Sequence, residues 1–290
     1  MIPASFDYSS PGTLAEAIAL LQQHGADAKI LAGGQSLIPL MKLRMAAPKH
    51  IVDINRIADL SYIREEDGHL AIGAMTREAD IDASALIRER YPILHDTASV
   101  IADPLVRNMS TVGGNLAHAD PANDHPATML ALGAEIVATG PGGARTIAVT
   151  DLFTGPFTTS LNADEILTEI RIPIAKVRSG GAYLKVERKV GDFPAAAVAV
   201  QIAFNGSTIA SAGIGLTNVG ATPIKAVRAE QALVGKAPDD GVIQEAARIA
   251  SEEAEPSEDL RGPVDYKRSL VRVLTARALR QAIARANGGS

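Results

Sequence analysis

The fold is decided by two short stretches, Ala32-Gly33-Gly34-Gln35-Ser36-Leu37-Ile38-Pro39 and Thr111-Val112-Gly113-Gly114-Asn115. Each contains two adjacent glycines beside small polar side chains, and the first directly follows a strand-like run at residues 29–31. Adjacent glycines allow positive φ angles and a close approach to a ligand, because no Cβ intervenes. Consecutive N–H groups in such loops can form a concave anion site. The two motifs therefore predict a diphosphate held between two loops, with Ser36, Thr111 and Asn115 as further donors.

Each motif could instead be a tight turn, a Rossmann loop or a P-loop. The residues alone leave the tight turn open as an alternative. Asp53 lies about 20 residues after Gly33, as the acid of a dinucleotide-binding Rossmann motif does, but the glycines are adjacent and the third is missing. No Gly-Lys-Ser or Gly-Lys-Thr sequence occurs, which argues against a P-loop.

The flanking segments predict a mixed α+β protein. Thr13 and Glu16 form a capping box before a helix that ends at Gly25. Asn205-Gly206 joins two apolar runs and predicts a β-hairpin. Further helices are predicted at 77–88, 124–133, 240–251 and 264–286. The pattern changes around residues 172–181, so we place a domain boundary there and divide the chain into residues 1–176 and 177–290.

Composition excludes several classes of function. The net charge of −5 and the 3% of aromatic residues argue against a nucleic-acid partner. The chain contains no Cys, so it offers no disulfide, no thiolate nucleophile and no Cys-ligated iron–sulfur cluster. No apolar run reaches the roughly 20 residues of a transmembrane helix, and the first residues do not form a secretory signal. We therefore expect an intracellular protein without a membrane span.

Catalytic and metal-binding patterns are weak. His118, Asp120, Asp124 and His125 include competent metal ligands, but their spacing matches no known signature. Asp124 has a competing role as the N-cap of the helix at 124–133. No nucleophile elbow occurs, and we predict neither a catalytic residue nor a metal ligand. The pattern is typical of a protein that carries a cofactor and leaves the chemistry to it.

On these two motifs the chain resembles the FAD-binding medium subunits of the xanthine oxidase family of molybdenum hydroxylases. The resemblance runs from the start to near the end of the chain, and Met1-Ile2-Pro3, Phe6-Asp7-Tyr8 and 214–219 are most similar to the carbon monoxide dehydrogenase branch. It implies that residues 1–176 form a two-subdomain FAD-binding fold of the vanillyl-alcohol oxidase type. Residues 177–290 would form a small antiparallel sheet with helices, of the CO dehydrogenase flavoprotein C-terminal type.

The resemblance also implies partners and a direction of electron flow. In this family a large subunit carries the molybdopterin cofactor and binds the substrate, and a small subunit carries two [2Fe–2S] clusters. Electrons would pass from those clusters to FAD on this chain and then to a quinone, NAD or O₂. The assembly would be a dimer of heterotrimers in the cytoplasm, either free or held at the inner membrane face through the complex.

The resemblance assigns cofactor contacts residue by residue. Those around the diphosphate and ribityl chain would be Ala32, Gly33, Gly34, Gln35, Ser36, Leu37, Thr111, Val112, Gly113, Gly114 and Asn115. Asp124 matches the acid that follows the second motif. Leu167 would touch the flavin or adenine, and Ile101 would pack on the flavin ring unless it is plain core.

Two further assignments concern the flavin ring. Lys185 matches a family lysine near the flavin, where a cation would stabilise the anionic reduced ring. Its alternative is a surface lysine in a basic patch with Arg188 and Lys189. Phe193 stands after Gly191-Asp192, where we expect the Tyr of the carbon monoxide branch. Phe keeps the stacking surface and loses the hydroxyl.

Three functions remain in competition. The first is an electron-transferring FAD subunit, with CO as the best substrate for the complex and aldehydes or N-heterocycles as competitors. The second is a stand-alone FAD oxidoreductase, for which no proton donor or base near the flavin is evident. The third is a non-redox nucleotide-binding domain.

Overall fold

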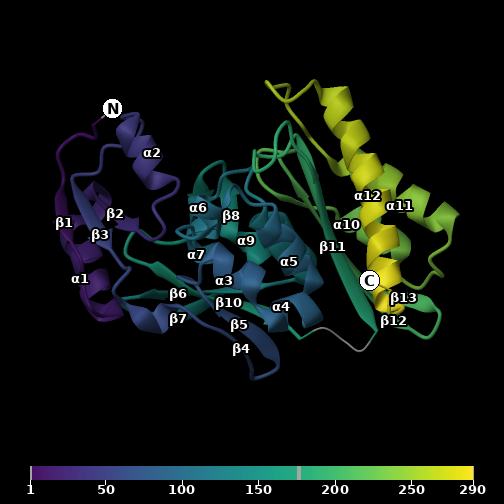
Figure 1. Ribbon diagram of the computed structural model, residues 1–290, viewed down its shortest axis with the longest axis horizontal. Coiled ribbons are helices and arrows are strands. Elements are labelled where there is room, and N and C mark those ends of the chain that lie inside the picture. The colour runs from purple at the N-terminus through teal and green to yellow at the C-terminus, as the bar shows by residue number, and fades with distance from the viewer. Residues whose placement is uncertain (1, 175–177, 290) are drawn as a thin grey trace.

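The computed structural model describes residues 2–174 and 178–289, and the chain runs through three main sheets in succession along its long axis (Figure 1). Helices cover the second and third sheets, which confirms the predicted α+β class. The predicted domain boundary between residues 176 and 177 lies outside the described residues.

The N-terminal part is a parallel three-stranded sheet of order β1-β3-β2. Its elements are β1 (Asp7–Ser9), α1 (Leu14–His24), the 3₁₀ turn Gly25–Asp27, β2 (Ala28–Leu31), α2 (Leu37–Lys42), β3 (His50–Asp53) and the 3₁₀ turn Ala58–Leu60. The capping box is confirmed, since the Glu16 amide donates to Thr13 Oγ1 at 3.2 Å and the Thr13 amide donates to Glu16 Oε2 at 3.2 Å. Because β2 and β3 are parallel, the first glycine motif and Asn55 both follow the C-terminal ends of their strands, on the same side of the sheet.

The middle part is a five-stranded antiparallel sheet of order β4-β5-β10-β6-β7. Its strands are β4 (Ile63–Glu66), β5 (His69–Gly73), β6 (Glu135–Gly140), β7 (Gly143–Ala148) and β10 (Ile166–Pro173), with a ribbon of β8 (Phe153–Gly155) and β9 (Thr158–Thr159). Its helices are α3 (Glu78–Ala83), α4 (Ala85–Arg90), α5 (Pro92–Ser99), α6 (Pro104–Arg107), α7 (Val112–His118), α8 (His125–Leu132) and α9 (Val149–Leu152). The helix α7, which opens at the second glycine motif, packs on β10.

The helix predicted over residues 77–88 is wrong as a single element. α3 ends at Ala83, and Ser84 leaves the helical conformation with φ −67° and ψ 120°. The Ser84 side chain instead accepts the Ile87 N–H at 3.3 Å and starts α4. Serine competes for backbone donors in this way, and it therefore favours helix ends over helix interiors.

The C-terminal part is a four-stranded antiparallel sheet with three helices. Its elements are β11 (Ser179–Val186), β12 (Ala196–Asn205), β13 (Thr208–Thr217), β14 (Ile224–Lys225), α10 (Val227–Leu233), α11 (Asp240–Glu253) and α12 (Val264–Ala286). The predicted hairpin is confirmed, with Gly206 at φ +59°.

This sheet is apolar on both faces. Val198 and Val200 belong to the cluster under α12, whereas Ala197 and Ala199 belong to a cluster with Ala127 of α8. Alternate residues of one strand point to opposite faces of the sheet. The helix α12 covers one face, and α5 and α8 of the middle part cover the opposite face. Within the described chain, no helix has both the length and the apolar character of a membrane span.

Candidate functional site

The first glycine motif forms a loop between β2 and α2 with unused donors. Gly34 has φ +72°, a conformation that L side chains rarely adopt. The backbone N–H groups of residues 33–36 find no acceptor among the described residues. Two side chains hold the loop in place: Asn55 Nδ2 donates to Ala32 O at 2.8 Å, and Arg77 Nη2 donates to Asn55 Oδ1 at 2.6 Å. Successive N–H groups without an acceptor are what an anion-binding nest requires.

The second glycine motif differs from the prediction. Its amides donate within the chain: Val112 to Thr76 O at 3.1 Å, Gly113 to Ala74 O at 3.0 Å, and Asn115 to Thr111 O at 2.9 Å. The Gly114 amide donates to Thr111 Oγ1 at 3.2 Å, which caps α7. The prediction that the second motif forms an anion site from its own N–H groups is therefore wrong for residues 112–115. The glycines here serve close packing, since a Cβ on Gly113 would lie 2.7 Å from Ala74 O.

The two motifs lie in contact. A Cβ on Gly33 would stand 2.7 Å from Ser110 Cα, and a Cβ on Gly114 would stand 3.7 Å from Ala32 Cβ. An isolated bridge between Arg77 and Thr111 fixes the second loop, and the Glu78 amide donates to Ser110 O at 3.1 Å. The structure therefore brings together the two segments that the sequence singled out. Of the other residues assigned to this end of the site, Gln35 is exposed and Leu37 is half-buried at the start of α2.

One polar atom beside the loops lacks a partner. Asn115 Oδ1 is buried and accepts no hydrogen bond from the described residues. The Asn115 main chain is held in place, because Asn123 Nδ2 donates to Asn115 O at 2.8 Å. An unsatisfied buried carbonyl oxygen costs about 1–3 kcal/mol, so a ligand with a donor at this point would be favoured.

Asp124 does not cap α8 as predicted. It occupies the N-cap position, but its carboxylate accepts no hydrogen bond from the helix and instead accepts one from the Tyr183 hydroxyl. Burial raises the pKa of the Asp124 carboxyl, although Lys185 and Tyr183 oppose that shift. Burial and the Asp124 charge together raise the pKa of the Tyr183 phenol well above its ordinary value. The tyrosine therefore stays protonated and donates.

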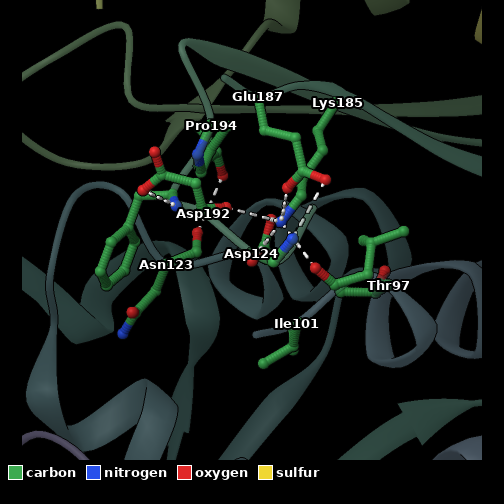
Figure 2. Close-up of polar contacts among 12 residues, drawn as sticks. Thr97, Ile101, Asn123, Asp124, Lys185, Glu187, Asp192 and Pro194 are labelled. Atoms are coloured by element: carbon green, nitrogen blue, oxygen red, sulfur yellow. Dashed lines mark hydrogen bonds and ion pairs between the residues drawn. The ribbon is translucent and has the colours of Figure 1, made fainter. Parts of the chain in front are cut away.

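Lys185 is buried beside Asp124, as Figure 2 shows, with Glu187 and Asp192 around the contact. Only 3% of its side chain is exposed. The alternative of a surface lysine in a basic patch is therefore wrong, although Arg188 and Lys189 nearby are exposed.

The three apolar candidates lie in different surroundings. Ile101 is 7% exposed, just after α5. Leu167 on β10 belongs to the apolar core of the middle sheet, and the neighbouring Thr168 O accepts the Ala74 amide at 3.0 Å. Phe193 is 43% exposed in the loop between β11 and β12, with the Arg261 guanidinium 5.9 Å from its ring centre.

The residues that resembled a metal site have other partners. His125 Nε2 lies 2.6 Å from Glu78 Oε2, and both side chains are fully buried. The His118 ring packs on Phe157 with 5.3 Å between ring centres. Among residues 2–174 and 178–289, no group of three His, Asp or Glu side chains is placed to hold a metal ion.

Sequence reasoning missed several residues that support the loops. Asn55 and Arg77 hold the first loop. Tyr183 donates to Asp124, and Asn123 donates to Asn115 of the second loop. A signal existed for Asn55, because it follows a parallel strand at the edge where ligands of open α/β sheets bind. Nothing in the local sequence marks Tyr183, which lies 59 residues from Asp124.

Comparison with known protein families identifies the family to which the chain belongs. Residues 4–175 match the FAD binding domain in molybdopterin dehydrogenase, and residues 181–282 match the CO dehydrogenase flavoprotein C-terminal domain. The chain belongs to the molybdopterin dehydrogenase FAD-binding family.

Relatives of this flavoprotein share nearly its whole length. The carbon monoxide dehydrogenase medium chain of Hydrogenophaga pseudoflava is 46% identical, over 98% of this chain and 99% of the relative. A solved structure of carbon monoxide dehydrogenase from the same organism, lacking the Mo-pyranopterin moiety, contains a chain with a TM-score of 0.96 and 47% identity, covering 98% of this chain and 99% of that one. The glyceraldehyde dehydrogenase medium chain of Sulfolobus acidocaldarius is 36% identical, over 97% of this chain and 99% of the relative.

The described residues fit FAD. A diphosphate needs several donors, and residues 33–36 offer four free N–H groups. Charge-assisted hydrogen bonds of this kind contribute about 1.5–3 kcal/mol each. The unpartnered Asn115 Oδ1 fits a hydroxyl or N–H donor of the same cofactor.

Proposed function

We propose that this flavoprotein is the electron-transferring subunit of a molybdenum hydroxylase whose substrate is CO. The observation that carries the proposal is the likeness to carbon monoxide dehydrogenase medium chains over nearly the whole chain. The absence of Cys fits this role, because clusters that feed the flavin must then sit on another chain.

We propose the FAD site at the contact of the two glycine motifs. The N–H groups of residues 33–36 would bind the diphosphate, and Asn115 would accept from the cofactor. Ile101 and Phe193 would contact the flavin ring, and Leu167 would touch the flavin or adenine. Asp124 would contact the cofactor, and Lys185 would lie near the flavin. When bound, FAD would accept electrons from iron–sulfur clusters and pass them to an external acceptor.

We further propose the partners and the division of the chain. A large subunit would carry the molybdopterin cofactor and a small subunit two [2Fe–2S] clusters, in a dimer of heterotrimers in the cytoplasm. Residues 1–176 would form the FAD-binding domain and residues 177–290 the C-terminal domain.

An aldehyde is the second candidate substrate, and the likeness to a glyceraldehyde dehydrogenase medium chain favours it. The test is dye reduction by the complex purified from its native host, with CO, glyceraldehyde and an N-heterocycle supplied separately. Reduction with CO alone supports the first candidate, and reduction with glyceraldehyde alone replaces it with the second. Purification as an active single chain would contradict both.

A further inference from the structure

The two glycine loops belong to different parts of the molecule. The first follows β2 of the N-terminal sheet, and the second opens α7 of the middle part. The loops touch at Gly33, where a Cβ would lie 2.7 Å from Ser110 Cα. Within the described chain, however, no hydrogen bond runs directly from residues 32–36 to residues 109–115. The spacing of the loops therefore depends on side chains that reach both of them.

Asn55 contacts the first loop in a fixed orientation. Its Nδ2 donates to Ala32 O at 2.8 Å and to Asp53 Oδ1 at 2.6 Å, and its backbone N–H donates to Asp53 Oδ1 at 2.9 Å. The Asp53 carboxylate is held in turn, because the Tyr8 hydroxyl donates to Oδ2 at 2.6 Å. Both N–H donors of the Asn55 amide are thus used, and its Oδ1 is left to accept from another part of the molecule.

Arg77 supplies the donor for Asn55 Oδ1. Arg77 directly precedes α3 of the middle part, and its Nη2 donates to Asn55 Oδ1 at 2.6 Å while its Nη1 donates to Met109 O. Met109 O is also the atom nearest to the position that a Cβ on Gly33 would take. One guanidinium therefore binds both sides of the place where the loops meet. Its planar fork suits two acceptors held in a fixed geometry.

Other contacts keep the N-terminal and middle parts together without Arg77. The Met75 amide donates to Leu60 O at 2.8 Å, in the turn after β3. Met75 and Ile166 also belong to the apolar cluster of the N-terminal part. These contacts do not involve the N–H groups of residues 33–36. We therefore expect the chain to fold when Arg77 is replaced, with the two loops less constrained.

We propose that Arg77 is a positioning residue that fixes the spacing of the two glycine loops and so prepares the site for the FAD diphosphate. The proposal rests on the FAD site proposed above. Arg77 acts through Asn55 on the first loop and through Met109 on the second, and not through a contact of its own with the cofactor. A site that is ordered before binding loses less conformational entropy when the ligand arrives.

Distances between spin labels test this link in the absence of FAD. The chain contains no Cys, so Met45→Cys after α2 and Leu105→Cys on α6 create labelling sites at side chains that are 74% and 79% exposed. Electron paramagnetic resonance on the full-length chain should give a narrow distribution of label distances, and Arg77→Met should broaden it. Arg77→Lys should broaden it as well, because a single ammonium nitrogen does not reproduce the fork.

Arg178→Met is the matched control. Arg178 Nη1 donates to Gly206 O and its Nη2 donates to Asn287 Oδ1 at 2.8 Å, so it joins a carbonyl and an asparagine as Arg77 does. Gly206 lies in the β12–β13 hairpin, at the end of the molecule away from β1, β2 and β3 (Figure 1). This variant should leave the label distances and the FAD affinity unchanged.

FAD affinity separates positioning from direct binding. Arg77→Met should raise the Kd for FAD by about tenfold, the factor typical of one lost hydrogen bond from a charged group, because FAD must then order the loops itself. In the Asn55→Ala background the same substitution should add no further loss, since the link to the first loop is already cut. Asn55 is exposed, so Asn55→Ala replaces Arg77→Met in both measurements if Arg77→Met does not fold.

An unchanged distribution of label distances in Arg77→Met, or full FAD affinity in Arg77→Lys, would overturn the proposal. Equal losses of affinity from Arg77→Met in the wild-type and Asn55→Ala backgrounds would also overturn it and place the guanidinium on the cofactor. A wild-type chain that binds no FAD would refute the proposed function instead, while the label distances would still decide whether Arg77 holds the loops together.

Discussion

The substitution Gly34→Ala, which adds a single methyl group, tests whether the first loop binds the diphosphate. Gly34 has φ +72°, and a Cβ there would lie 2.7 Å from Ile38 Cδ1 and 3.1 Å from Leu31 Cδ1. An L residue in this conformation costs about 1–2 kcal/mol. Relief of that strain turns the peptide groups of the loop, and the proposed diphosphate then loses at least one of the N–H donors of residues 33–36. Loss of one charge-assisted hydrogen bond, about 1.5–3 kcal/mol, raises the Kd for FAD by at least about tenfold.

The control is Gly68→Ala in the turn between β4 and β5. Gly68 has φ +81° and no atom within 4 Å of its would-be Cβ, so it carries the same backbone strain without a nearby site. Fluorescence titration of the FAD-free chains should show weaker binding for Gly34→Ala only, while both variants lose thermal stability and Gly34→Ala loses more because its Cβ also meets Ile38 and Leu31. Gly34→Val should abolish FAD retention. Equal FAD affinity in Gly34→Ala and Gly68→Ala would refute the nest.

Three further predictions concern stability and the second loop. Asn115→Leu removes a buried unpaired oxygen, so it should raise the thermal midpoint of the FAD-free chain and weaken FAD binding about tenfold. A lower thermal midpoint would count against the role of Asn115 Oδ1. Ser84→Ala should cost about 1 kcal/mol in urea unfolding by removing the cap of α4, with Ser99→Ala as a neutral comparison. The Arg145 hydrogen bond lowers the pKa of the Glu165 carboxyl below its ordinary value of 4.5, so this pair stabilises the chain above about pH 4.5 and less as pH falls through the lowered pKa. Arg145→Gln should therefore lower the thermal midpoint at neutral pH and approach the wild type in acid; a gap that stays constant with pH would contradict the assignment.

Local rules predicted much of the fold. The capping box of Thr13 and Glu16 and the Asn205-Gly206 turn act over a few residues, so their sequence patterns are sufficient. Ser84 is also a local signal, but the apolar periodicity of residues 77–88 continues across it and suggested one helix.

The site was predictable only in part, because its remaining interactions are long-range. The first motif signals its own free N–H groups, whereas the amides of the second are taken by Ala74 and Thr76, which only the tertiary fold brings close. The position of Asp124 before a helix indicated a cap, yet its carboxylate accepts a hydrogen bond from Tyr183 on β11, 59 residues further along the chain. Lys185 stands close to Arg188 and Lys189 in the sequence, and its burial follows from the packing of α5 and α8 on the third sheet.

The most direct test of the central claim is the visible spectrum of the complex purified from its native host, before and after anaerobic addition of CO. We expect a flavin spectrum that bleaches with CO, FAD in the supernatant after acid precipitation, and two further subunits on the gel. A complex that contains no flavin, or one whose flavin stays oxidised with CO and with glyceraldehyde alike, would contradict the account.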